Sequence, residues 1–123
     1  MWYIFVEKRG VFIKKLINWR LYNNKELVIE NKNIYCDYID DEIIYVENNN
    51  INRVSLLTKK FIRETNEYKI ELDFNNKEMI YILKENNIKF TTEFEGNINI
   101  NDDEINITYN IDEDNLLIII QLL

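Results

Sequence analysis

The sequence predicts an all-β domain in the form of a small antiparallel meander barrel. Three observations support this fold class. Apolar and polar side chains alternate through most of the chain, as they do in strands with one buried face. Such segments recur about every 10 to 12 residues, a spacing typical of barrels and sandwiches. The segments between them are rich in Asn and Asp, which tolerate turn conformations and replace glycine where only 2 of 123 residues are Gly.

The alternation is clearest in the C-terminal half of the chain. Tyr68 and Ile70 fall on one face of a predicted strand, while Lys69 and Glu71 fall on the other. The turns between the strands are expected at residues 75–76, 85–87, 101–103 and 112–115. The predicted core comprises Tyr68, Ile70, Leu72, Phe74, Ile88, Phe90, Phe94, Ile105, Ile107, Tyr109 and Ile111.

The N-terminal half has a similar but less regular pattern. Strands are predicted at residues 2–7, 25–30, 33–39, 42–47 and 53–59, with turns near 31–32, 40–41 and 48–52. Residues 11–22 fit both a strand and a helix, because their apolar side chains satisfy both spacings. We favour the strand, since Lys8, Arg9 and Gly10 suit a hairpin turn after the first strand. The alternative folds are a β-sandwich, and an α+β domain with one short helix at 11–22.

The apolar run at residues 116–120 has two interpretations. It is either a central strand covered on both faces or an exposed edge strand. In the second case a homodimer would form through this C-terminal strand, because long apolar edges recruit other strands.

Length and composition predict one globular domain over residues 1–123, with 46% hydrophobic residues for its core. The net charge of -7 disfavours direct binding to nucleic acid or to an anionic membrane surface. A single cysteine, the lack of a signal peptide pattern and the lack of a membrane-spanning run predict a cytoplasmic protein.

The residue types of most catalytic and cofactor sites are scarce or missing. The chain contains no His, 2 Gly and 1 Cys, which argues against nucleophilic triads, zinc sites and phosphate-binding loops. We therefore expect no enzyme activity, no cofactor and no metal. The acidic clusters lie where turns are expected and lack the spacing of a calcium loop. Cys36 has an acidic neighbour and is expected to be an inert, packed thiol.

Seven charged residues are candidates for contacts with a ligand or partner. An arginine facing the inside of a barrel could hold a carboxylate by two parallel hydrogen bonds. Acidic side chains on the surface could contact a basic protein. The candidates are Arg53, Arg63, Glu93, Glu95, Asp102, Asp103 and Glu104.

The stretch from residue 53 to 123 resembles the YwiB-like family of bacterial β-barrels, which are related to the calycins. The matching features are Arg63 in a strand, a strand ending in Phe74, the alternating segment 88–94, and Tyr109 in the final hairpin. The chain departs from the family at residues 85–87, where a Pro-aromatic-Gly turn is usual, and after Arg63, where a Gly is usual. The resemblance implies a barrel and supplies no catalytic residues.

Two hypotheses for function follow from these observations. The first is a non-enzymatic binding module that buries an apolar or protein ligand, and it requires a cavity of several hundred Å³ if the ligand is enclosed. The second is an acidic inhibitor, of the phage anti-defence or immunity type, that occupies the basic nucleic-acid-binding surface of an enzyme. The second requires a filled core and an acidic face on one side. A hydrolase acting through carboxylates alone is a third and weaker hypothesis.

Overall fold

The structure is a computed structural model, in which the backbone is described for residues 2–7 and 10–123 and the side chains for residues 14–123. The described residues form strands and turns, with no helix. The strands are β1 (Trp2–Glu7), β2 (Gly10–Asn23), β3 (Glu26–Ile39), β4 (Glu42–Glu47), β5 (Asn50–Ser55), β6 (Lys60–Glu64), β7 (Tyr68–Asp73), β8 (Glu78–Leu83), β9 (Ile88–Glu93), β10 (Gly96–Ile100), β11 (Glu104–Ile111) and β12 (Asp114–Leu122).

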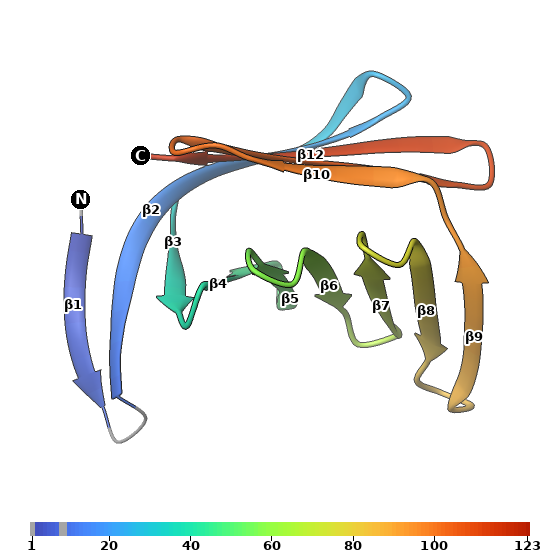
Figure 1. Ribbon diagram of the computed structural model, residues 1–123, viewed down its shortest axis with the longest axis horizontal. Helices are drawn as coiled ribbons and strands as arrows, with labels where there is room; N and C mark the ends of the chain where they lie inside the picture. The colour runs from blue at the N-terminus through green and yellow to red at the C-terminus, as the bar shows by residue number, and fades with distance from the viewer. Residues whose placement is uncertain (1, 8–9) are drawn as a thin grey trace.

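All strands belong to one 12-stranded antiparallel sheet that curls into an open half-barrel (Figure 1). The strand order is β10-β11-β12-β2-β3-β4-β5-β6-β7-β8-β9, and β1 pairs with β2 outside this path. In Figure 1, β10 and β12 run across the strands from β4 to β9 and form a second layer over them. The all-β prediction is therefore confirmed, and the barrel is an open one.

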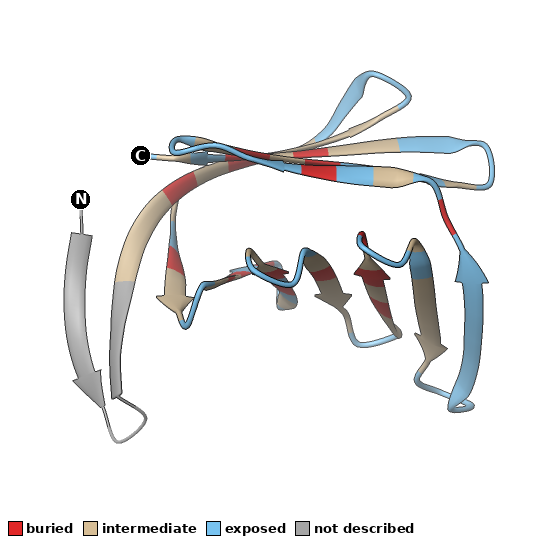
Figure 2. Ribbon diagram, viewed as in Figure 1, coloured by how far each residue is buried: buried red, intermediate tan, exposed pale blue. Residues whose placement is uncertain are grey.

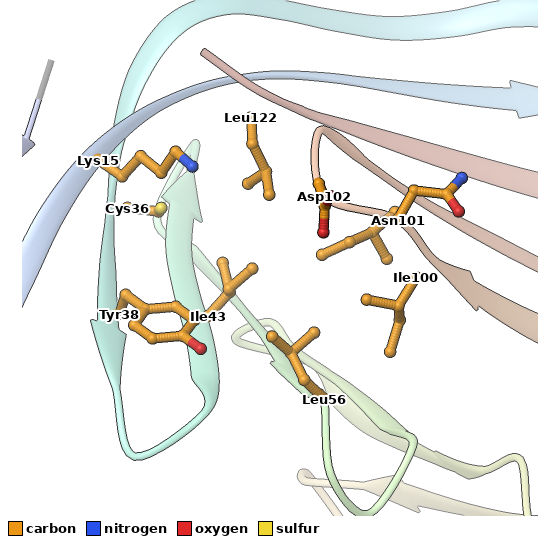
Figure 3. A pocket seen from close by; sticks show the side chains of 10 residues that line it. Lys15, Cys36, Tyr38, Ile43, Leu56, Ile100, Asn101, Asp102 and Leu122 are labelled. Carbon is orange, nitrogen blue, oxygen red and sulfur yellow. The ribbon is translucent and has the colours of Figure 1, made fainter.

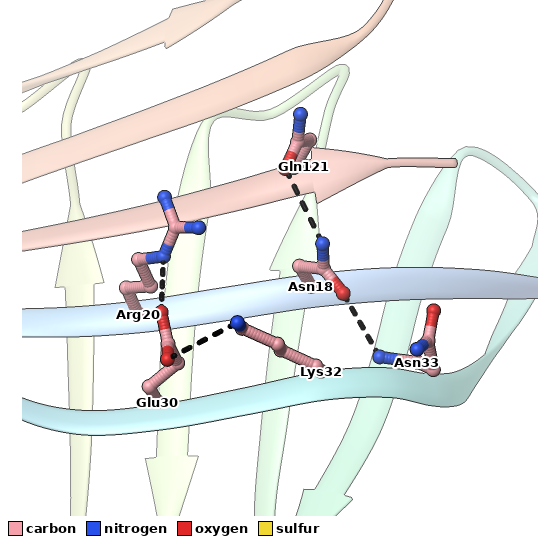
Figure 4. Close-up of polar contacts among 6 residues, drawn as sticks. All are labelled: Asn18, Arg20, Glu30, Lys32, Asn33 and Gln121. Atoms are coloured by element: carbon pink, nitrogen blue, oxygen red, sulfur yellow. Dashed lines mark hydrogen bonds and ion pairs between the residues drawn. The ribbon is translucent and has the colours of Figure 1, made fainter.

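The long strands β2 and β3 join the two layers, because each belongs to both. The segment 17–23 of β2 pairs with β12, whereas its segment 10–15 pairs with β1. The register of β2 and β3 shifts between Ile17 and Trp19, where Asn33 has a φ of 55°. The Asn18 side chain accepts a hydrogen bond from the Asn33 backbone N–H at 2.8 Å (Figure 4).

This irregularity corrects one prediction. A turn was expected at residues 31–32, but the chain continues there as β3 with a β-bulge. Asn33 adopts the left-handed conformation of the bulge, where the strand bends. The asparagines in this segment therefore mark a bulge and not a reversal of the chain. The reversal lies at Asn24 and Lys25, with φ values of 50° and 72°. On the outer face, beside the bulge, Arg20 on β2 and Glu30 on β3 form an ion pair at 2.7 Å (Figure 4).

The other predicted turns are present, although those at 48–52 and 112–115 are shorter than expected because β5 begins at Asn50 and β12 at Asp114. Many of them contain residues with positive φ. Asp40 and Asp41 have φ values of 51° and 61°, and Asn48 and Asn49 have values of 47° and 66°. Two consecutive residues with positive φ suit a tight two-residue hairpin, for which Asn and Asp substitute for Gly.

The core lies between the two layers and is centred on Trp19, Tyr45 and Phe61, which are almost fully buried. Trp19 and Tyr45 have ring centroids 5.4 Å apart. Most of the predicted core is confirmed: Ile70, Leu72, Phe74, Phe94, Ile105, Ile107 and Tyr109 are buried, and Tyr68 and Ile111 pack against them. Ile88 and Phe90 were predicted in the core but are 40% and 53% exposed.

The two ambiguous segments are strands. Residues 11–22 belong to β2, as favoured from the sequence, although Lys8 and Arg9 of the predicted turn lie outside the described residues. Residues 116–120 belong to β12, which is paired with β11 on one side and β2 on the other. β12 has no open edge, so the interpretation of this segment as an exposed edge strand was wrong.

Candidate functional site

Arg63, on β6, faces the inside of the half-barrel and already holds a carboxylate of the same chain. Its Nη1 lies 2.5 Å from Oε1 of Glu47 and donates a 2.9 Å hydrogen bond to Oδ1 of Asn52. The side chains of Arg63 and Glu47 are only 14% and 3% exposed. Strand register explains the arrangement, because Asn52 on β5 is the cross-strand partner of Arg63. The inward orientation considered from the sequence is thus present, and Glu47 occupies the position proposed for a ligand.

Tyrosines surround this ion pair and affect its electrostatics. Burial alone would lower the pKa of Arg63, but hydrogen bonding with Tyr68 and the charge of Glu47 raise it above the usual value. Burial raises the pKa of Tyr109 to about 12 and that of Tyr45 further still, with Arg63 opposing both shifts. Arg63 therefore stays charged at physiological pH, and Tyr45 and Tyr109 stay neutral.

Beyond Arg63, the inner surface of the half-barrel is apolar and open. We call this surface the inner aromatic face, and its residues are Tyr68, Tyr81, Leu83, Ile88 and Phe90. Cross-strand pairing places Tyr68 beside Leu83 and Tyr81 beside Phe90. The rings of Tyr68 and Tyr81 are stacked, with centroids 5.4 Å apart. Figure 2 shows β9 exposed along its length, with a buried residue only where the chain leaves it.

A small cavity of about 220 Å³ lies at the other end of the core (Figure 3). Its walls are mainly apolar, but Lys15 and Asp102 add one charge of each sign. Burial lowers the pKa of Lys15, while the charges of Cys36 and Asp103 oppose that shift. The cavity is smaller than the pockets of about 300 to 1,000 Å³ that enclose typical small-molecule ligands. It is lined by Lys15, Cys36, Tyr38, Ile43, Leu56, Ile100, Asn101, Asp102, Ile105 and Leu122.

Cys36 lines this cavity but is 2% exposed, and its pKa is raised to about 11, mainly by burial. We predict that the native thiol is alkylated at least about a hundredfold more slowly at pH 8 than the thiol of the urea-unfolded chain. The pKa difference of about two units lowers the thiolate fraction by that factor. Iodoacetamide labelling followed by mass spectrometry measures both rates, and equal rates would contradict an inert thiol.

The predicted acidic contacts do not form one patch. Glu93 and Glu95 lie where β9 leads into β10, whereas Asp102 and Asp103 lie in the turn at the far end of β10. These four residues are exposed. Glu104 begins β11, and its carboxylate accepts a 3.3 Å hydrogen bond from the Asn106 side chain.

Arg53 lies apart from all of these residues, on the outer face of β5. Its Nε forms a 3.0 Å ion pair with Glu42, and its side chain is 48% exposed. Arg53 is therefore a surface charge and does not face the inside of the half-barrel, where it could hold a ligand.

Sequence reasoning missed Glu47 and Tyr81. The signal for Glu47 was weak, because a glutamate at the end of a strand normally faces solvent. Tyr81 lies in the apolar segment 79–83, whose alternation is masked by apolar residues on both faces.

Comparisons with known proteins identify no relative. No protein-family model matches the chain, and no curated protein or solved structure matches it significantly. The resemblance to the YwiB-like family therefore stays a prediction. Within residues 2–7 and 10–123, no helix is long and apolar enough to cross a membrane. The same part of the chain has no cluster of His, Cys, Asp or Glu suited to a metal ion.

Proposed function

We propose that this protein is a non-enzymatic binding module that holds a protein ligand on its inner aromatic face. The observation that carries the proposal is the exposure of Phe90 and Ile88 on the concave side of the sheet, beside the stacked rings of Tyr68 and Tyr81. Contiguous exposed apolar surfaces of this kind are typical of interaction sites, and aromatic side chains are enriched in them. The proposal includes a cytoplasmic location, because a chain with a single cysteine suits a reducing compartment.

An enclosed ligand is less consistent with this structure. Trp19, Tyr45 and Phe61 fill the centre of the half-barrel, and the cavity beside Cys36 holds only about 220 Å³. A protein surface needs no such cavity, because it can lie across the open face. A filled core was also required by the acidic inhibitor hypothesis. However, the separation of Glu93 and Glu95 from Asp102 and Asp103 gives that hypothesis no single acidic face, so it ranks second.

The proposal predicts that Phe90→Ser weakens the binding of Nile red several-fold. This neutral dye fluoresces on apolar surfaces and is not repelled by the net charge of -7. Leu57→Ser is the matched control, because Leu57 is 75% exposed in the turn after β5, away from the inner aromatic face. Fluorescence titration measures both variants, and circular dichroism verifies that they are folded. Equal losses in the two variants, or none in Phe90→Ser, would refute the inner aromatic face as the binding surface.

A further inference from the structure

Strand β9 is an open edge of the sheet, and the protection evident on it is a pair of charged side chains, Lys89 and Glu93. It ends the strand path and pairs only with β8 among the described strands. Natural proteins protect such edges with prolines, bulges, charged side chains on the edge strand or inward-pointing charges. β9 has regular pairing with β8, no proline, and Ile88, Phe90 and Thr92 on its inner side.

At the opposite end of the strand path, the free edge of β10 is partly covered by a side chain. The Lys77 ammonium donates a hydrogen bond to the Gly96 carbonyl. Asn110 N–H bonds to Glu95 O at 3.0 Å, so the alternation of antiparallel pairing directs the Gly96 carbonyl to the free side of β10. A side chain therefore already occupies part of that edge.

The free backbone groups of β9 can be assigned from its pairing with β8. Phe94 N–H donates to Lys77 O at 3.1 Å, which makes these two residues a hydrogen-bonded pair. Because such pairs alternate along an antiparallel ladder, the N–H and C=O groups of Lys89, Thr91 and Glu93 point away from β8. These three residues also share the outer face of the sheet.

The charged side chains on this edge are complementary to those of a second copy of β9. If a second β9 lies antiparallel with Thr91 opposite Thr91, Lys89 of each copy lies opposite Glu93 of the other. The same register lets the free backbone groups of all three residues pair. Shifting the strands to place Lys89 opposite Lys89, or Glu93 opposite Glu93, would bring like charges together.

A second copy would also relieve an unfavourable contact within the chain. Glu78 and Glu93 are cross-strand partners and are both exposed, so their like charges destabilise the β8–β9 pairing. Lys89 of the second copy would lie beside Glu93 and offset that repulsion. On the inner side, Phe90 would gain Thr92 of the second copy as a neighbour.

We propose that two copies of this chain form a two-fold dimer through β9, with Thr91 at the symmetry axis and two Lys89–Glu93 ion pairs across the interface. The interface is isologous, because the same strand serves both copies. It joins the two sheets edge to edge by strand addition. This inference goes beyond the proposed function, since the interface uses the free edge and the outer-face charges of β9 and not the inner aromatic face.

Charge-reversal variants test the register directly. We expect Lys89→Glu to abolish the dimer, because every contact at these positions would then be acidic. Glu93→Lys should abolish it equally, because every contact would be basic. An equimolar mixture of the two variants should form a heterodimer, because an acidic edge then meets a basic one. Both residues are exposed, so both variants should fold, as circular dichroism can verify.

Sedimentation velocity of the full chain, from micromolar to millimolar concentration, measures the association. Physiological ionic strength is used, where a Debye length of about 8 Å screens the repulsion between two copies of net charge -7. A wild-type protein that stays monomeric, single variants that dimerise, or a mixture that does not associate would each overturn the inference. If the dimer fails while Nile red binding still depends on Phe90, the proposed function survives with another partner.

Discussion

Replacing Arg63 by methionine is expected to lower the free energy of unfolding by about 3 to 5 kcal/mol. The substitution leaves the buried Glu47 carboxylate without the guanidinium that lies 2.5 Å from it. Removing one member of a buried ion pair costs this much because the remaining charge is neither paired nor hydrated. Urea unfolding followed by tryptophan fluorescence measures the change, since Trp19 lies in the core.

Two further variants distinguish the destabilisation caused by an unpaired buried charge from that caused by losing the arginine side chain. The double variant Glu47→Leu with Arg63→Met should be more stable than Arg63→Met alone, because no unpaired charge remains. Arg53→Met is the surface control, since the Arg53–Glu42 pair is largely exposed and should contribute less than about 1 kcal/mol. An Arg63→Met variant no less stable than the Arg53→Met variant would refute a structural role for the buried pair.

The fold class follows from the sequence because alternation is a local property. Ile70 and Leu72 on β7, and Ile105 and Ile107 on β11, are buried as their spacing predicts. Each has a polar neighbour on either side, which identifies the inner face before any strand pairing is known. Turn positions such as Asp40 and Asp41 are equally local, since they depend on which side chains tolerate positive φ.

The curvature and extent of the sheet are not local properties. Ile88 and Phe90 alternate as core residues do, and they face the inner side as predicted. They are nevertheless exposed, because β9 is the last strand of the path and no further described strand pairs with its free edge. The alternation reports which face a residue occupies, whereas its burial also depends on where its strand lies in the sheet.

The candidate site required the same non-local information. Arg63 could be identified as a residue of interest, but its partner could not, because Glu47 lies 16 positions away on a strand that does not pair with β6. The two side chains meet across the intervening β5, where Asn52 completes the contact. The relative position of the acidic residues was also not a local property, because β10 separates Glu95 from Asp102.

Replacing Gly96 by alanine is expected to destabilise the protein by about 3 kcal/mol, the upper part of the usual range for overpacking. Gly96 begins β10, where the chain passes from one layer to the other. A Cβ atom there would lie 2.4 Å from the Thr108 carbonyl oxygen and 2.9 Å from the Phe94 ring. The first contact is with backbone held in the β10–β11 ladder, so it cannot be relieved by rotating a side chain.

The matched control for this position is Asn99→Ala, because Asn99 is exposed on the same strand. A surface substitution of this kind should change the free energy of unfolding by no more than about 0.5 kcal/mol. Denaturant unfolding of both variants measures the difference. If Gly96→Ala were as stable as Asn99→Ala, the close approach of β10 to Thr108 could not be what requires glycine there. A loss of stability in Gly96→Ala alone would show that the passage of the chain from one layer to the other requires a residue without a side chain at this position.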